Sequence, residues 1–166
     1  MNDINKDIES AIIDPSTGLN NFAYFLRRLK MGVSCSRRHK IPIVSIVIEF
    51  DIHVESKGEL SGEERESALK LIGNTVNSSI RWDSDLAGRI EENKIGIVLM
   101  QCKKEEAMII VNRILDNFKK SNPLNRKDGS RIFISLKMGH IAADLSHDSL
   151  SLLKEAEENV AVNETV

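Results

Sequence analysis

Apolar residues along this chain follow two kinds of pattern, which predict different elements. The runs at 43–50 and 95–100 are nearly unbroken and rich in Ile and Val, as is typical of strands buried on both faces. The run at 132–138 alternates apolar and polar residues, which indicates a strand with one buried face. A shorter mixed run at 86–90 predicts the strand that precedes 95–100.

A polar stretch at 91–94 separates the runs at 86–90 and 95–100. A gap that short predicts a tight hairpin between the two strands. Asn93 is the residue of this stretch that adopts a left-handed backbone most easily. The tip of the hairpin therefore carries charged side chains and no apolar ones.

Apolar residues at spacings of three and four predict four helices, at about 20–38, 62–80, 107–118 and 146–160. Asn20 or Asn21 offers a side-chain oxygen to cap the first of these helices. Ser61 and Glu64 have the spacing of a capping box before the second. Ser146 is the predicted cap of the last helix.

The core order is strand, helix, strand, strand, helix, strand, which is the split βαβ pattern of a ferredoxin-like α/β (α+β) sheet. A right-handed crossover leaves a gap between the first and second strands, and the third strand fills it, antiparallel to both. Glu49 and Asp51, at the end of the first strand, should then lie beside the charged hairpin tip. We expect one domain at 14–160, a leading helix or linker at 1–13 and a tail at 161–166.

Composition narrows the classes of partner. The 23 basic and 25 acidic residues nearly balance, so we expect no nucleic-acid partner and no anionic membrane surface, and any partner is recognised locally. No apolar run is long enough for a membrane span and the N-terminus is polar, so we expect a cytoplasmic protein. Cys35 and Cys102 have no metal-type spacing and are expected to be reduced core or near-core thiols.

Several segments resemble one family. DPSTGLNNFAYFLRRL at 14–29 resembles the opening DPLTGLPNRRYFLERL signature of GGDEF domains, which are diguanylate cyclases that condense two GTP molecules into cyclic di-GMP. DLAGRIEENKIGIVL at 85–99 is similar to the family's DLVARLGGDEFAVLL segment. SLKMGHIA at 135–142 and LLKEAEENV at 152–160 resemble its SIGIA strand and LLKRADEAL helix. The resemblance implies the nucleotidyl cyclase-like palm fold and a role in bacterial signalling.

The chain departs from the family at the motif that gives the family its name. Where the family has Gly-Gly-Asp-Glu-Phe, this chain has Glu91, Glu92, Asn93, Lys94 and Ile95. The two glutamates place bulk and negative charge where the resemblance puts the nucleotide triphosphate. Lys94 replaces the family's glutamate metal ligand, and an ammonium group cannot coordinate a metal ion.

The other positions that the resemblance assigns are partly retained. Glu49 and Asp51 match the family's two carboxylates, which could bind metal but beside a lysine more often form an ion pair. We predict that the ammonium of Lys94 takes the place of the lost metal and pairs with Glu49 or Asp51. Lys57 and Glu66 stand where the family has residues that contact guanine, so base recognition is weakened.

The family's product-inhibition motif, Arg-x-x-Asp, is displaced by one residue. Its arginine position holds Trp82, with Arg81 one place off and Asp85 retained. A one-residue shift re-aims the guanidinium group, so we expect no binding of cyclic di-GMP there. Trp82 is interpreted as a packing residue, with a partner anchor as the alternative.

The remaining candidate residues predict no further site. The four histidines, His39, His53, His140 and His147, are interpreted as surface or loop residues and not as a metal cluster. We expect no cofactor and no bound metal. The leading functional hypothesis is a catalytically inactive regulatory or protein-interaction module with a protein partner in cyclic di-GMP-type signalling. The alternatives are a sensor that binds GTP or cyclic di-GMP without turnover, and a residual cyclase.

Overall fold

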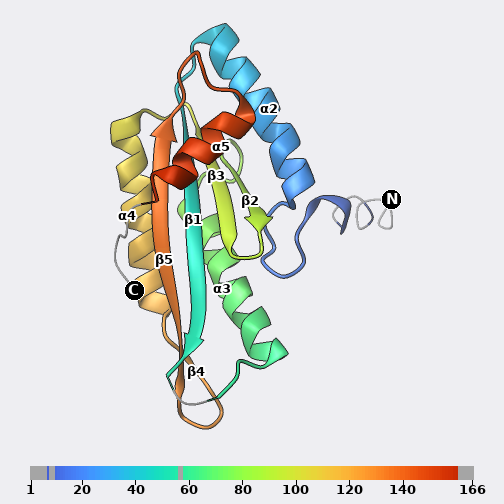
Figure 1. Ribbon diagram of the computed structural model, residues 1–166, viewed down its shortest axis with the longest axis vertical. Coiled ribbons are helices and arrows are strands. Elements are labelled where there is room, and N and C mark those ends of the chain that lie inside the picture. Colours follow the sequence, from blue (N-terminus) through green and yellow to red (C-terminus); the bar gives the residue numbers. More distant parts are fainter. Residues whose placement is uncertain (1–6, 8–9, 56–57, 161–166) are drawn as a thin grey trace.

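A sheet with the strand order β2-β3-β1-β5-β4 lies at the centre of the molecule (Figure 1). The computed structural model describes residues 7, 10–55 and 58–160. Its strands are Ile43–Val54 (β1), Leu86–Glu91 (β2), Lys94–Met100 (β3), Leu124–Asn125 (β4) and Arg131–Ala142 (β5). Each neighbouring pair of these strands is antiparallel.

β3 lies between β1 and β2 and is antiparallel to both, as the ferredoxin-like pattern predicts. Its register with β1 ends at the pair Glu49↔Lys94, and on its other side Val98 faces Leu86 of β2. The predicted α+β class and strand order are therefore confirmed. β4 was not predicted, because a strand of two residues carries no hydrophobic pattern.

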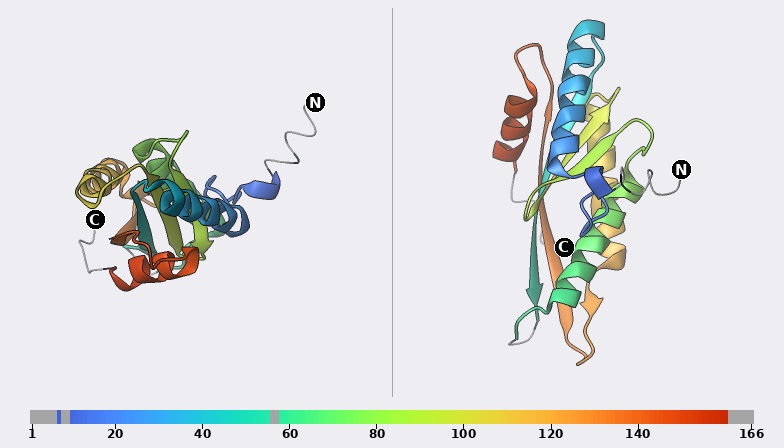
Figure 2. Two further views of the ribbon diagram at one scale, coloured as in Figure 1. Left: turned by 90° about the horizontal axis from the view of Figure 1, so that it is seen from above. Right: turned by 90° about the vertical axis from the view of Figure 1, so that its right-hand side faces the viewer.

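Two layers of helices cover the sheet (Figure 2). The helices are Phe22–His39 (α2), Gly62–Ser79 (α3), Lys104–Ser121 (α4) and Ser149–Glu158 (α5). α3 and α4 pack over one face of β1, and α2 and α5 pack over the other. Alternate residues of β1 enter the two cores, which is why its sequence is apolar almost without interruption.

The caps of the first two helices agree with the sequence. The Asn21 side chain accepts a hydrogen bond from the Tyr24 backbone N–H at 3.0 Å. Ser61 and Glu64 form the predicted capping box, in which each side chain bonds to the other residue's backbone N–H. Glu64 also receives two hydrogen bonds from the Arg126 guanidinium group, which join α3 to the β4–β5 hairpin.

Protonation of the Glu64 carboxylate should account for part of the stability that this fold loses in acid. Arg126, and next the Ser61 backbone N–H, lower the pKa of Glu64 from 4.5 to about 2. Its contribution to stability is thus present above pH 4.5 and is lost as the pH falls toward 2. We expect Glu64→Gln to be destabilised in urea unfolding at neutral pH and to approach the wild type in strong acid. Glu63→Gln, beside it, is the control, and a Glu64→Gln deficit that does not change with pH would contradict the prediction.

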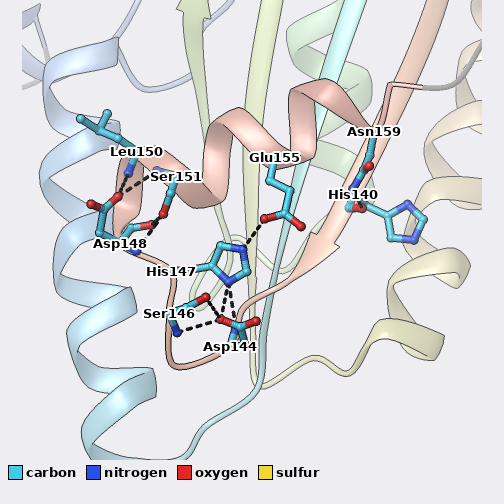
Figure 3. Close-up of polar contacts among 9 residues, drawn as sticks. All are labelled: His140, Asp144, Ser146, His147, Asp148, Leu150, Ser151, Glu155 and Asn159. Carbon is cyan, nitrogen blue, oxygen red and sulfur yellow. Dashed lines mark hydrogen bonds and ion pairs between the residues drawn. The ribbon is translucent and has the colours of Figure 1, made fainter.

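The last helix begins later than predicted. α5 starts at Ser149, and the carboxylate of its N-cap Asp148 accepts hydrogen bonds from two backbone N–H groups of the first turn (Figure 3). Ser146, the predicted cap, instead bonds to the Asp144 carboxylate through its own N–H and hydroxyl groups. The prediction was wrong because both residues have capping side chains, and only the local turn decides between them.

His147 lies in the loop before α5, which agrees with the interpretation of the histidines as surface or loop residues, but it is buried, with only 5% of it exposed. Its Nδ1 accepts a hydrogen bond from the Asp144 backbone N–H at 3.0 Å, and its Nε2 lies 2.7 Å from Glu155 Oε2 (Figure 3). The Arg37 guanidinium of α2 donates to the His147 carbonyl oxygen. His147 therefore connects α5, the loop before it and α2 through polar contacts.

The β2–β3 hairpin is present but tighter than predicted. Its strands extend to Glu91 and Lys94, which leaves Glu92 and Asn93 as the turn. Among the described residues, the non-glycine residues with positive φ are Lys40 and Gln101, so the turn does not use the left-handed conformation that Asn93 can adopt. The pairing of β2 with β3 is irregular near the turn, where the register shifts between Arg89 and Glu91.

The aromatic ring of Phe25 explains two glycines in this hairpin. Gly88 and Gly96 face each other across β2 and β3. A Cβ atom would lie 2.6 Å from Phe25 at Gly88 and 2.8 Å from it at Gly96. Both positions must therefore lack a side chain for α2 to pack against the hairpin.

Three other predictions concern Trp82, the two cysteines and the two ends of the chain. Trp82 is 88% exposed, so its interpretation as a packing residue is wrong. Cys102 is buried as expected, whereas Cys35 is exposed on α2. Most of the predicted leading segment, 1–6 and 8–9, and the predicted tail at 161–166 lie outside the described residues.

Candidate functional site

Glu49 and Lys94 face each other where β1 passes the start of β3. They form the last register pair of the two strands, and the Phe50 N–H donates to the Asn93 carbonyl oxygen at 3.0 Å. Both side chains point to the α2 and α5 side of the sheet, because they alternate with the residues that enter the α3 and α4 core. The predicted proximity of Glu49 to the hairpin tip is confirmed.

The ammonium group of Lys94 lies among three carboxylates. Its Nζ is 3.0 Å from Glu91 Oε2 and 4.0 Å from Glu49 Oε1, and it makes a short contact with Glu157 Oε1. The Lys94 side chain is only 15% exposed. Hydrogen bonding to Glu157, and next to Glu91, raises the pKa of Lys94 well above its ordinary value. The lysine is therefore held as a cation at neutral pH.

Asp51 does not join this group, contrary to expectation. Its side chain is 81% exposed, and Asp51 Oδ2 lies 3.7 Å from His53 Nδ1. Residues on one face of a strand repeat at about 6.5–7 Å, and β3 ends its pairing with β1 at Glu49. Asp51 thus lies one repeat beyond the reach of Lys94.

Two of the three carboxylates around Lys94 were missed in the sequence. Glu91 lies three residues before Lys94 across a two-residue turn, a spacing that could have predicted the contact. Glu157 comes from α5, which approaches the sheet closely because Gly139 of β5 has no side chain: a Cβ atom there would lie 2.2 Å from the Ala156 carbonyl oxygen. No local pattern predicts where α5 crosses the sheet.

The residues at this point do not fit the divalent metal ion that the family resemblance implies. An ammonium group offers only hydrogen-bond donors, and Lys94 lies between the carboxylates that would otherwise be ligands. Within the residues that the structure describes, no group of three or more His, Cys, Asp or Glu side chains is arranged to hold a metal ion. The arrangement is an internal ion-pair network.

The hairpin tip is tied to the elements on both sides of it. Arg65 of α3 forms an ion pair with Glu92 at 2.8 Å. Arg89 donates to the Glu92 carbonyl oxygen at 2.8 Å and lies 3.5 Å from the Asp14 carboxylate. Glu92 therefore stands in an ion pair at a position where the family has a bare glycine.

The positions matched to the guanine contacts give little support to base recognition. Lys57 lies outside the described residues. Glu66 is half exposed and pairs with Lys70, one turn further along α3, at 2.8 Å. A hydrogen bond from Lys70 lowers the pKa of Glu66.

Arg81 and Asp85, the remnants of the inhibitory motif, bind each other. The Asp85 side chain is fully buried and accepts hydrogen bonds from Arg81 Nε at 3.1 Å and Nη2 at 2.8 Å. It also accepts from the backbone N–H groups of Arg81 and Met100, both at 3.0 Å. The pair thus holds the loop between α3 and β2 against the end of β3.

The part of the chain that the structure describes has no helix long and apolar enough to cross a membrane.

Similarity to solved structures supports the fold. The diguanylate cyclase SiaD from Pseudomonas aeruginosa, in complex with its activator SiaC, has a TM-score of 0.78 and 21% identity over 96% of this chain and 61% of that one. The coiled coil and GGDEF domain of DgcB from Caulobacter crescentus, in complex with cyclic di-GMP, has a TM-score of 0.78 and 14% identity over 95% and 82%. The GGDEF domain of YfiN from Pseudomonas aeruginosa has a TM-score of 0.72 and 21% identity over 89% and 86%.

This chain therefore spans about three fifths of the length of SiaD. A comparison with curated proteins finds no match. At identities this low, the structural similarity shows the fold alone. The family model described as "Diguanylate cyclase, GGDEF domain" matches residues 11–164, nearly the whole chain. The chain belongs to the GGDEF family.

Proposed function

We propose that this chain is a catalytically inactive GGDEF domain, which acts as a regulatory or protein-interaction module in cyclic di-GMP signalling. The observation that carries the proposal is the ion-pair network of Lys94 with Glu49, Glu91 and Glu157. Lys94 stands where the family resemblance places a metal-binding glutamate.

The electrostatic interaction energies that support this proposal are large compared with thermal energy. At about 4 Å and an effective dielectric of about 20, each pair of unit charges interacts by roughly 4 kcal/mol. A divalent ion beside the Lys94 ammonium is repelled, and Glu91 and Glu92 add negative charge where the family binds a triphosphate. Both changes disfavour metal-bound GTP.

A role through a protein partner has a parallel in the family, since SiaD is bound to its activator SiaC in its structure. The alternative, a sensor that binds GTP or cyclic di-GMP without turnover, makes a different prediction. Calorimetric titration with each nucleotide, with and without magnesium, separates the sensor, the residual cyclase and the inactive module. We expect no saturable heat under any of these conditions.

Incubation with GTP and magnesium should yield no cyclic di-GMP, measured by chromatography against a blank without protein. The matched variant carries Glu91→Gly, Glu92→Gly, Asn93→Asp and Lys94→Glu together. It should gain magnesium binding but not full activity, because Lys57 and Glu66 still replace the guanine contacts. Steady product formation by the unaltered chain would refute the proposal.

A further inference from the structure

Positive charge on this chain is concentrated on α2. The helix and its C-cap residue, 22–40, contain six Lys and Arg residues and no Asp or Glu. This leaves 17 basic and 25 acidic residues, a net charge of −8, on the rest of the chain. The near-neutral total therefore hides one strongly basic helix.

The cations on the outer side of α2 have no carboxylate partner among the residues that the structure describes. Arg27, Lys30 and Arg38 are exposed, and none forms an ion pair with any residue in the described part of the chain. Arg28 donates to the Tyr24 hydroxyl and lies over its ring. By contrast, arginines on other elements pair with carboxylates, among them Arg65, Arg81, Arg89, Arg126 and Arg131.

These cations flank an exposed apolar residue. Arg27, Met31 and Arg38 are spaced by four and seven residues, so they share the helix face opposite the buried residues of α2. Met31 is 60% exposed. A hollow between α2 and the β2–β3 hairpin opens beside it, with apolar walls that include Leu29, Leu86, Val98 and Met100. Methionine at such a site adapts its shape to different apolar partners.

We infer that the basic face of α2, defined by Arg27, Lys30, Met31 and Arg38, docks an acidic amphipathic segment of a partner protein. Carboxylates of that segment pair with the three cations, and an apolar side chain packs on Met31 and into the adjacent hollow. α2 is about 27 Å long, which matches a helical segment of four to five turns. The inference rests on the proposed function, since it names the partner of an interaction module.

The distribution of charge favours a short acidic segment over a large polyanion. Exposed charges are screened beyond about 8 Å at physiological ionic strength, so a segment lying along α2 meets mainly its cations. A membrane surface or a nucleic-acid duplex extends further and also faces the acidic remainder of the chain. Helices that bind membranes also present broad faces of Trp, Phe and Leu, and the exposed large apolar residues of α2 are Phe22 and Met31.

The test is fluorescence anisotropy with a labelled peptide of about 18 residues, in which Leu and Glu repeat at helical spacing. Arg27→Glu with Arg38→Glu should weaken binding at least about tenfold, and Met31→Ser about fivefold. Lys104→Glu with Lys127→Glu has the same change of charge on other elements and should leave binding unchanged. Raising the salt concentration from about 50 mM to about 200 mM should weaken binding to the unaltered chain.

Peptides that replace Glu by Gln, or Leu by Ser, should bind weakly. Equal loss in both double variants, or no loss in either, would overturn the inference. So would tighter binding of duplex DNA or phosphatidylserine vesicles, or self-association that Arg27→Glu with Arg38→Glu abolishes. Thermal melts check folding, and Arg27→Gln with Arg38→Gln replaces any double variant that fails to fold. GTP turnover by the same preparation would refute the proposed function without deciding peptide binding.

Discussion

Lys94→Glu should destabilise the protein more than Lys94→Ala does, and magnesium should restore part of the loss. Lys94→Ala leaves the carboxylates of Glu49, Glu91 and Glu157 together without their cation, at a cost of a few kcal/mol. Lys94→Glu adds a fourth carboxylate, so repulsion deepens the loss. In a chain of this size, each kcal/mol lowers Tm by roughly 2–4 °C.

Magnesium can stabilise Lys94→Glu only by binding the folded state in preference to the unfolded one. It should raise the Tm of Lys94→Glu but not that of the unaltered protein, whose ammonium occupies the same space. Lys104→Glu replaces an exposed lysine of α4 and is the control for a change of charge alone. An unchanged Tm for Lys94→Ala would count decisively against the network.

A double-mutant cycle of Lys94→Ala and Glu157→Ala isolates the pair that the sequence did not predict. Because the raised pKa of Lys94 lies above its ordinary 10.5, and its partners Glu157 and Glu91 are ionised at neutral pH, its contribution is present from neutral pH up to 10.5. It is lost only as the pH rises through the raised value. The cycle should therefore give the same coupling energy at pH 6 and pH 8, ~0.5–3 kcal/mol for residues in contact.

The strand order could be predicted from the sequence because it depends on local patterns. Unbroken apolar runs at 43–50 and 95–100 require burial on both faces, and right-handed crossover leaves one arrangement of the strands. The pairing of Glu49 with Lys94 follows from that arrangement. Local chemistry also predicted the capping box of Ser61 and Glu64, whose partners are three residues apart.

The rest of the site depends on contacts that no local pattern encodes. Glu157 reaches Lys94 because α5 crosses the sheet at Gly139, which is a property of tertiary packing. Asp51 was included because it stands with Glu49 at the end of the predicted first strand, but the pairing of β3 with β1 ends at Glu49. Trp82 was interpreted as packing because aromatic residues usually bury area, yet the loop that holds it is fixed by the Arg81–Asp85 pair and leaves the ring exposed.

Asp85→Ala should be one of the most destabilising single substitutions in the loop between α3 and β2, although Asp85 belongs to the remnant of an inhibitory motif. Its buried carboxylate accepts hydrogen bonds from the backbone N–H groups of Arg81 and Met100 and from the Arg81 guanidinium. Removing it strands these donors, and each unsatisfied buried donor costs about 1–3 kcal/mol. We expect a loss of roughly 3 kcal/mol, which lowers Tm by about 6–12 °C.

Arg81→Ala should cost less, because the half-exposed guanidinium leaves behind an Asp85 that still accepts two backbone hydrogen bonds. Unfolding in urea for the two variants, with Asp83→Ala as the exposed neighbouring control, measures this order. The order matters for ligand binding, because cyclic di-GMP could recruit Arg81 only by breaking the bonds that hold it to Asp85 and to the Met100 carbonyl oxygen. Calorimetry with micromolar cyclic di-GMP should therefore give no saturable heat. Heat that saturates in the unaltered chain and vanishes in Arg81→Ala would show instead that the guanidinium is available to the ligand.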